Sequence, residues 1–328
     1  MHTLAPIDRL EILVLVDNVT DNLSTNPAGV TTEFSGLFAS GRLKLLCGKA
    51  ICCAHHGLSF LVTAYIGTKR RCILFDAGPE AEGFLRNVSV LGADLPSVEA
   101  VVLSHGHWDH AGGLLVALEA ITGGQRGKVD CFMHPGMFAT RGIRRADGTL
   151  SEMEPVPQPE ALAAAGADVH ITREPVRLGD GAFYLSGEIP RVTSYETGMP
   201  GQIRMAADGS GWEPDELLVD ERFVAIHVQG KGLVVLTACS HAGVVNVLRH
   251  AAATFPDVPL YAVMGGLHLS GSTERIIPQT VADLHEFKLQ LIAAGHCTGW
   301  RAINALAAAF GDALVPSAVG KRYVIGKQ

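Results

Sequence analysis

The sequence predicts an α/β protein in which two β-sheets are packed between outer layers of helices. The last third of the chain alternates apolar strand-like runs with amphipathic helical stretches, the pattern of a sheet covered by helices. The first part instead carries several apolar runs in succession, separated by turn residues, as expected for consecutively paired strands. A chain of 328 residues with 48% hydrophobic residues is long enough to bury the large core that two such sheets require.

The first part of the chain is expected to be rich in strands. In order, we expect strands at 10–16, about 45–54, 58–66, 71–76 and 100–104, a helix at about 112–121, and a strand at 129–134. The middle, at about 136–215, is punctuated by Gly and Pro, with Pro155, Pro157 and Pro159 in quick succession. We expect it to be an irregular insertion that forms a wall or lid of a site.

The last part is expected to alternate regularly. We expect strands at 223–228, 232–237, 259–264 and 289–294, with helices at 242–253, 276–288 and 301–309. No linker rich in Pro, Gly or Ser and no run of charges divides the chain. One domain spanning residues 1–328 is therefore expected.

Composition excludes several classes of function. The formal net charge of −7 argues against a nucleic-acid-binding protein, because such affinity comes from clustered Lys and Arg. The apolar run 12–16 is too short to span a membrane, and the first residues lack the pattern of a signal peptide, so we expect a cytoplasmic protein without a membrane partner. Seven cysteines without a Cys-x-x-Cys pair argue against a disulfide framework. A small-molecule substrate is the expected partner, and a homo-oligomer is compatible with the sequence.

The most informative stretch is 105–110, His-Gly-His-Trp-Asp-His, which places four potential metal ligands directly after an apolar strand. Two imidazoles spaced by two residues point the same way in extended backbone, so His105 and His107 can share one ion. Asp109 and His110 lie on the turn that follows, placed for a second ion. Imidazole with carboxylate suits zinc, with iron or manganese as alternatives, and does not suit an all-oxygen calcium site.

This pattern, His-x-His-x-Asp-His after an apolar strand, resembles the signature of the metallo-β-lactamase superfamily. The segment 72–78, Cys-Ile-Leu-Phe-Asp-Ala-Gly, is similar to the strand and turn that precede the signature there. In that superfamily the aspartate supports a ligand imidazole, so the resemblance gives this role to Asp76, where it would fix the tautomer of the ring. The fold that the resemblance implies is an αβ/βα four-layer sandwich of two mixed sheets flanked by helices.

Five further segments resemble the branch of the superfamily named after dihydropterin-ribofuranosylaminobenzene phosphate synthase. They are His-His-Gly-Leu-Ser at 55–59, Gly-Glu-Ile-Pro-Arg at 187–191, Thr-Ala-Cys-Ser-His-Ala-Gly at 237–243, Gly-Gly-Leu-His-Leu at 265–269 and Gly-His-Cys-Thr-Gly at 295–299. The resemblance covers nearly the whole chain. The name of the branch is a weak guide to substrate, because one fold and even one metal site serve many chemistries.

Three later histidines, His241, His268 and His296, each follow an apolar strand, where an α/β sheet presents side chains to a site. In the superfamily one late histidine completes the ligands of the first ion, a carboxylate bridges both ions, and the last histidine completes the second. The resemblance therefore implies His241 and His296 as ligands. His268 is expected either to be an extra ligand or to support one.

The chain departs from the superfamily pattern at two positions. Where relatives often have Pro-Gly-His, it has Gly-Glu-Ile at 187–189, and where they have Gly-Asp as the bridge, it has Ala-Cys at 238–239. Glu188, Cys239 and His241 are therefore alternatives for the third ligand and the bridge, with His241 preferred for the former. A thiolate would bind zinc well but would make the site sensitive to oxidation.

The chemistry implied by such a site is activation of water. Two divalent ions lower the pKa of a bound water from ~16 toward ~7 and neutralise charge on the attacked oxygen. Asp109 is the expected catalytic residue, orienting the hydroxide and accepting its proton. We expect His56 to line the substrate pocket and Arg191 to bind a substrate phosphate or carboxylate in a bidentate manner.

Three functions fit these observations. The first is a metal-dependent hydrolase with two ions, zinc being expected, that uses a metal-bound hydroxide on a small phosphorylated, heterocyclic or ester substrate. The second is a transferase that condenses a dihydropterin methyl diphosphate with ribofuranosylaminobenzene phosphate. The third is a non-catalytic metal- or ligand-binding protein, which would predict a missing ligand, whereas the four-residue core of the signature is intact.

Overall fold

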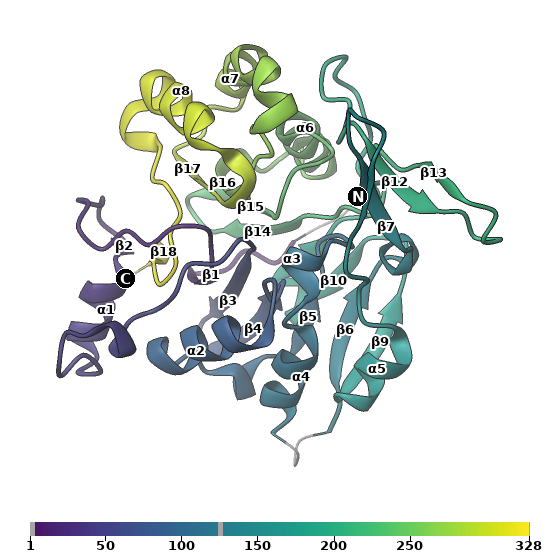
Figure 1. The fold of residues 1–328 in the computed structure, drawn as a ribbon. Helices are drawn as coiled ribbons and strands as arrows, with labels where there is room; N and C mark the ends of the chain where they lie inside the picture. The colour runs from purple at the N-terminus through teal and green to yellow at the C-terminus, as the bar shows by residue number, and fades with distance from the viewer. Residues whose placement is uncertain (1–3, 124–126, 328) are drawn as a thin grey trace.

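The computed structural model describes residues 4–123 and 127–327, and its largest feature is a mixed sheet of eight strands (Figure 1). From one edge to the other, its strands are β2 (Val30–Thr31), β18 (Arg322–Gly326), β1 (Arg9–Val16), β3 (Ser59–Ile66), β4 (Lys69–Phe75), β5 (Ala100–Val102), β6 (Val129–Met133) and β9 (Ala167–Ile171). The strands from β2 to β4 pair antiparallel with their neighbours, whereas β4, β5, β6 and β9 run parallel. The carboxyl ends of the parallel strands therefore lie along one edge of the sheet.

A second sheet of six strands comes mainly from the last part of the chain. In spatial order, its strands are β10 (Val176–Leu178), β11 (Phe183–Leu185), β14 (Val224–Val228), β15 (Gly232–Thr237), β16 (Leu260–Gly266) and β17 (Leu291–Gly295). The first four pair antiparallel, and β15, β16 and β17 run parallel with a helix after each. All four strands predicted for this part of the chain are confirmed.

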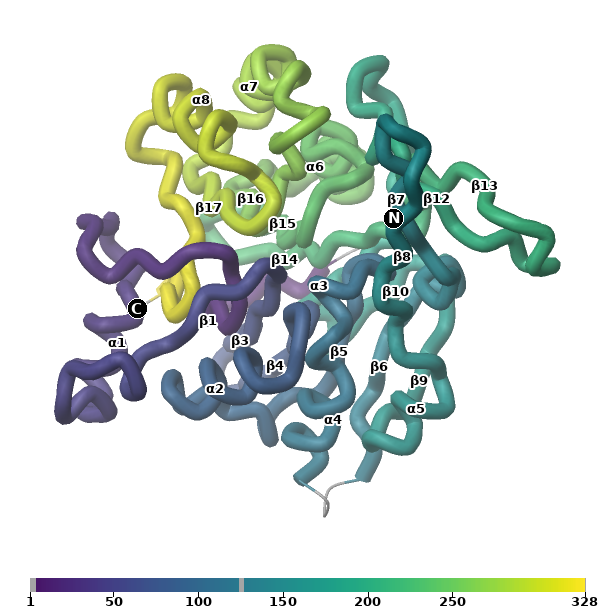
Figure 2. The backbone as a smooth tube through the Cα atoms, in the orientation of Figure 1, coloured from purple at the N-terminus to yellow at the C-terminus, as the bar shows by residue number. Residues whose placement is uncertain are grey.

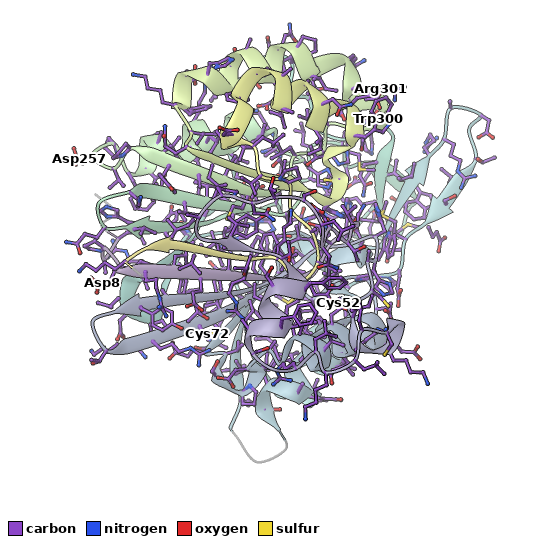
Figure 3. The ribbon with its side chains drawn as sticks, turned by 90° about the vertical axis from the view of Figure 1, so that its left-hand side faces the viewer. Asp8, Cys52, Cys72, Asp257, Trp300 and Arg301 are labelled. Atoms are coloured by element: carbon purple, nitrogen blue, oxygen red, sulfur yellow. The ribbon has the colours of Figure 1, made fainter. Side chains whose placement is uncertain are left out.

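The helices form the two outer layers. The helices that cover the sheets are α2 (Ala81–Leu91), α4 (Leu114–Thr122) and α5 (Pro159–Ala164) on the eight-stranded sheet, and α6 (Val244–Thr254), α7 (Ile277–Leu284) and α8 (Trp300–Phe310) on the six-stranded sheet (Figure 1). Viewed from the side, the strands of the two sheets stack below the upper helices (Figure 3). The expected αβ/βα sandwich is confirmed. Among the described residues, no helix combines the length and apolar character needed to cross a membrane.

Strand β15 shows why the second sheet forms. All six of its residues are buried, because the strand has helices on one side and the other sheet on the other. Val234 and Leu236 belong to the core between the two sheets, whereas Leu233 and Val235 pack among the residues of α6 to α8. A strand that is covered on both faces must be apolar at every position, which gives the continuous apolar run seen in the sequence.

The prediction of a strand at about 45–54 is wrong. The structure has only a short 3₁₀ turn there, Gly48–Ala50, followed by extended chain without a strand partner. Side chains satisfy the backbone instead: the Cys52 N–H donates to Glu33 Oε1 at 2.6 Å, and the Cys53 N–H donates to Asn87 Oδ1 at 2.8 Å. A composition that suits a strand is overridden here by polar side chains from α1 (Glu33–Ala39) and α2, neither of which was predicted.

The segment 136–215 contains more regular structure than its Pro and Gly content indicates. Besides β9 to β11 and α5, it forms a small antiparallel sheet that projects from one side of the molecule (Figure 2). The strands of this sheet, in order, are β13 (Trp212–Pro214), β12 (Gln202–Met205), β7 (Arg141–Arg144) and β8 (Leu150–Glu152). Short strands joined by turns give only weak patterns in a sequence, which is why they were missed. The helix predicted at 276–288 is also shorter, since α7 ends at Leu284.

Candidate metal centre

The candidate site lies where strands of both sheets end. Asp76 follows β4, and the signature 105–110 follows β5 and includes the short helix α3 (Trp108–Ala111). From the other sheet, His268 comes shortly after β16, and His296 directly follows β17. Asp76, His268 and His296 have φ of 60°, 44° and 48°, a region that L-residues rarely adopt. Such strained backbone persists only where the surroundings fix it, and it is concentrated at functional sites.

One group of ligand atoms is formed by His105, His107 and His241, whose ring nitrogens lie within 4.8 Å of one another. His105 Nε2 and His107 Nδ1 are 3.1 Å apart. Two nitrogen ligands of one tetrahedral zinc ion are separated by about 3.3 Å, given zinc–nitrogen bonds of about 2.0–2.1 Å. The first two imidazoles thus come together as expected, but on a bend instead of extended backbone, since the His107 N–H donates to the His105 carbonyl at 3.1 Å. His241 joins them from the other sheet.

A second group is formed by Asp109, His110 and His296. Asp109 Oδ2 lies 3.7 Å from His110 Nε2 and 3.3 Å from His296 Nε2. All three side chains are buried, and the rings of His110 and His296 are 5.0 Å apart. The two groups adjoin each other, since the rings of His105 and His110 are only 4.4 Å apart. The site therefore offers two neighbouring sets of three ligands.

Hydrogen bonds behind the imidazoles turn their lone pairs toward the site. The hydroxyl of Ser104 donates to Asp76 Oδ2, so its oxygen accepts from His105 Nδ1 at 2.9 Å and leaves a lone pair on His105 Nε2. Asp76 Oδ2 also lies 2.7 Å from His110 Nδ1. A carboxylate can only accept, so His110 carries a proton on Nδ1 and directs Nε2 into the site. The support expected from Asp76 is thus directed at His110.

His296 is oriented by a residue that the sequence did not indicate. Asn18 Oδ1 lies 2.9 Å from His296 Nδ1, so this nitrogen is the donor and Nε2 keeps its lone pair. Buried His296 Nε2 then faces Asp109 Oδ2 with no hydrogen-bond partner. Both ring nitrogens of His241 are likewise buried without a partner. Buried polar atoms are rarely left unpaired, so this set of residues fits divalent cations well.

The surroundings also set the protonation of the ligands. Burial lowers the pKa of His107 to about 3, and it lowers the pKa of His105 and His241 well below the ordinary value. These three rings are therefore neutral and ready to bind a metal at neutral pH. Burial alone would raise the pKa of Asp109, but His110 and His296 hold it below its usual range, so the carboxylate is ionised.

A thiol occupies the position where a bridging carboxylate was expected. Cys239 Sγ lies 3.2 Å from His110 Nε2 and can form a ligand group with His105 and His110. It also belongs to a group with His268 and Cys297, and Cys297 had not been singled out in the sequence. Burial alone would raise the pKa of the Cys297 thiol, but its contacts with Cys239 and His296 lower it. The centre therefore carries sulfur on one side.

Three buried charged residues brace the loops that carry the ligands. Glu221 accepts hydrogen bonds from the backbone N–H groups of His241 and Ala242 at 2.7 Å and 2.6 Å. Asp220 Oδ2 accepts from the Gly106 N–H and from Arg141 Nη1. The sequence analysis missed all three. For Asp220 and Glu221 the sequence offers one local signal. They belong to the run Val-Asp-Glu-Arg at 219–222, whose charges directly precede an apolar strand and so lie close to a core.

Two expected site residues are placed differently. Glu188 is paired with Arg173 at 2.7 Å and with His134 Nε2 at 3.1 Å, and it belongs to none of the potential ligand groups found among the described residues. The structure therefore brings Glu188 together with His134 and Arg173 and not with the other candidate ligands. Arg191 donates through both terminal nitrogens to the carbonyls of Ile189 and Leu217. The bidentate contact with a substrate expected for Arg191 is thus not available in this conformation.

Comparison with known proteins agrees with this geometry. Residues 55–209 match the model of the metallo-beta-lactamase superfamily. A 7,8-dihydropterin-6-methyl-4-(beta-D-ribofuranosyl)-aminobenzene-5'-phosphate synthase from Methanocaldococcus jannaschii is 31% identical over 255 residues, which cover 76% of this chain and 83% of that protein. The chain belongs to the metallo-β-lactamase superfamily. An uncharacterised protein of the same organism is 29% identical over 255 residues, which cover 77% of this chain and 88% of that protein.

Solved structures of the metallo-β-lactamase superfamily share the fold. Tm1679, described as a metal-dependent hydrolase of the beta-lactamase superfamily, superposes with a TM-score of 0.71 at 22% identity, covering 97% of this chain and 100% of its own. YhfI from Bacillus subtilis, a metallo-beta-lactamase fold protein, reaches a TM-score of 0.50 at 12% identity, with coverage of 97% and 100%. At these identities the likeness establishes the fold alone.

Replacing Asp76 with Asn is expected to weaken metal binding roughly tenfold to a hundredfold, the range found for residues that support a ligand histidine. The amide retains the size of the carboxylate, and Asn tolerates the positive φ of this position. Asp76 Oδ1 accepts from the Ser104 N–H, and Oδ2 accepts from the Ser104 hydroxyl and from His110 Nδ1; an amide has only one oxygen and cannot serve both sides, so the orientation of His110 is lost. Competition with a chromophoric chelator measures the change. Unaltered affinity in a folded variant would contradict this role.

Metal affinity of the Asp109, His110 and His296 group is expected to increase as the pH rises toward about 9. Burial alone would lower the pKa of His110, but Asp109 and Asp76 raise it to about 9. Below that pH an incoming ion must displace a proton from His110, whereas His107, with its pKa of about 3, has none to lose. Chelator competition at several pH values separates the two groups. Equal pH dependence of both would be inconsistent with this assignment.

Proposed function

We propose that this protein is a hydrolase that depends on two divalent metal ions, with zinc as the expected metal, and acts on a small phosphorylated, heterocyclic or ester substrate. The observation that carries the proposal is the convergence of imidazole and carboxylate lone pairs on two adjoining positions. His105, His107 and His241 would hold one ion, and Asp109, His110 and His296 the other. When bound, two such ions supply a water of lowered pKa and neutralise charge on the attacked oxygen.

The side chains of the site orient the metal ligands and supply an acceptor for the proton of the attacking water. Asp109 is the catalytic residue of the proposal, because its ionised carboxylate lies between His110 and His296 and can accept a proton from water. Asp76 and Asn18 hold His110 and His296 in the tautomers that leave Nε2 free. Cys239 replaces the usual bridging carboxylate, which gives the centre a softer donor.

The substrate is expected to be small. A pocket adjoins the site at His241 and His268, with walls from the start of α6 and from 195–200, and its volume of about 20 Å³ admits only a water-sized group in this conformation. The acidic balance of the chain, −7, agrees with a small substrate, because it disfavours nucleic acids.

A second candidate function is a transferase that joins a dihydropterin methyl diphosphate to ribofuranosylaminobenzene phosphate. The observation that favours it is the 31% identity with the synthase of M. jannaschii over most of both chains. In this reaction the same residues would hold metal ions that stabilise the leaving diphosphate, and the attacking group would be the aminobenzene instead of water. Both candidates thus use the same centre and differ in the nucleophile.

The test combines metal analysis with a comparison of nucleophiles. Protein purified without chelator should contain two metal equivalents per chain, and its activity on phosphodiesters, esters or lactones should disappear on chelation and return with metal. With a pterin methyl diphosphate as substrate, a hydrolase releases diphosphate in the absence of the aminobenzene, whereas a transferase requires it. One metal equivalent, or activity that survives chelation, would refute the dinuclear proposal.

A further inference from the structure

Asn18 lies between two imidazoles at the candidate metal centre. It lies two residues after the end of β1. Its Oδ1 contacts the ring of His296, a proposed ligand, and its Nδ2 contacts the ring of His56. His56 is exposed, with 59% of its side chain accessible, and lies beside Asp109. The role of His56 therefore depends on which of its nitrogens carries a proton.

The orientation of the Asn18 amide is fixed by the backbone. Its Oδ1 accepts from the Gly57 N–H at 3.1 Å, and its Nδ2 donates to the carbonyl of His296 at 3.2 Å. Rotating the amide by half a turn would place two donors against each other at Gly57 and two acceptors against each other at His296. Backbone groups have no alternative tautomer, so only one orientation satisfies both contacts.

This orientation determines the tautomer of His56. Asn18 Nδ2, which can only donate, lies 3.0 Å from His56 Nδ1, so Nδ1 is an acceptor and carries no proton. The ring is then neutral and its single N–H is on Nε2. His56 Nε2 is 3.5 Å from Asp109 Oδ2, too far for a good hydrogen bond, so this N–H remains available to another acceptor. The ring is also close to His296, with centroids 5.1 Å apart.

We propose that Asn18 is a positioning residue that holds His56 as the Nε2–H tautomer, and that this N–H donates a hydrogen bond to the substrate oxygen that gains negative charge during the reaction. The inference rests on the proposed metal-dependent function. The acceptor is a phosphoryl, carbonyl or leaving-group oxygen lying beside Asp109. A neutral imidazole suits this role, because a preorganised donor stabilises a developing charge without having to transfer a proton.

The tautomer can be measured without any substrate. In zinc-loaded protein labelled with ¹⁵N-histidine, two-bond ¹H–¹⁵N correlations of His56, assigned by their absence in His56→Gln, should show the pattern of an Nε2–H ring. In Asn18→Asp, a carboxylate faces His56 Nδ1, so this nitrogen should gain a proton. Zinc content is measured alongside, because the carboxylate still accepts from His296 Nδ1 but no longer donates to the His296 carbonyl. A proton on Nδ1 in the wild type, or an unaltered His56 in Asn18→Asp, overturns the inference.

Kinetics test the donor itself. His56→Ala should lower kcat/KM on the order of a hundredfold at saturating zinc, the effect of losing one donor to a developing charge. His56→Gln retains an N–H donor and should recover part of this loss. His55→Ala is the matched control, since His55 contacts Glu80 instead of the centre and its loss should have little effect. Equal losses in His55→Ala and His56→Ala contradict the proposal. If no substrate is hydrolysed, the proposed function fails, whereas the tautomer measurement still decides the inference.

Discussion

Replacing His107 with Ala is expected to remove one of two metal equivalents and to lower kcat/KM by roughly 10²- to 10⁴-fold, since a metal contributes several kcal/mol of charge stabilisation and each 1.4 kcal/mol is a factor of ten. His107 shares its position with His105, 3.1 Å away, and with His241. Two imidazoles alone retain zinc poorly, because zinc sites in enzymes use three protein ligands. Elemental analysis and steady-state kinetics measure both effects.

The variant His296→Ala tests the second position in the same way. It should lose the other equivalent while the ion held by His105, His107 and His241 remains. His285→Ala is a suitable control, because His285 is exposed, stacks on Phe310 and belongs to none of the potential ligand groups found among the described residues. Retention of two metal equivalents in His296→Ala would mean that other residues hold the second ion. The group of Cys239, His268 and Cys297 would then be examined first.

Replacing Arg141 with Met is expected to lower the free energy of unfolding by about 3–5 kcal/mol, the cost of breaking a buried ion pair by removing one partner. Arg141 is 3% exposed and lies 2.8 Å from Asp215 and 2.9 Å from Asp220. Methionine fills much of the volume but leaves Asp220 buried without its cation, and Asp215 with only Arg204 at 3.8 Å. Asp220 also holds the Gly106 N–H, so the loop of the signature should loosen as well.

Urea unfolding of metal-free protein measures this loss, with Arg204→Met as the matched control. Arg204 belongs to the same small sheet and pairs with Glu213 at 2.7 Å, with both side chains about two-fifths exposed; its contact with Asp215 is longer, at 3.8 Å. Such exposed pairs contribute at most about 1 kcal/mol. If Arg141→Met were as mild as Arg204→Met, the buried pair would not stabilise this part of the molecule.

The sequence predicted most of the two main sheets but little of what projects from them. Strands such as β15 are buried on both faces, so their continuous apolar pattern is legible without a structure. The strands β7, β8, β12 and β13 are short and partly exposed, and their sheet forms through contacts that local composition does not encode. The stretch 45–54 shows the reverse case, because Glu33 and Asn87 take the backbone hydrogen bonds that a neighbouring strand would have used.

The metal signature was determined by the sequence itself, because the spacing of His105, His107, Asp109 and His110 on one strand end fixes their proximity through local geometry alone. The tertiary structure decided which distant residues complete and orient this centre. Asn18 reaches His296 across 278 positions, and Cys239 reaches His110 across 129. Contacts of that kind depend on how two sheets dock, and a polar side chain that orients a ligand leaves no periodicity or spacing by which the sequence could reveal it.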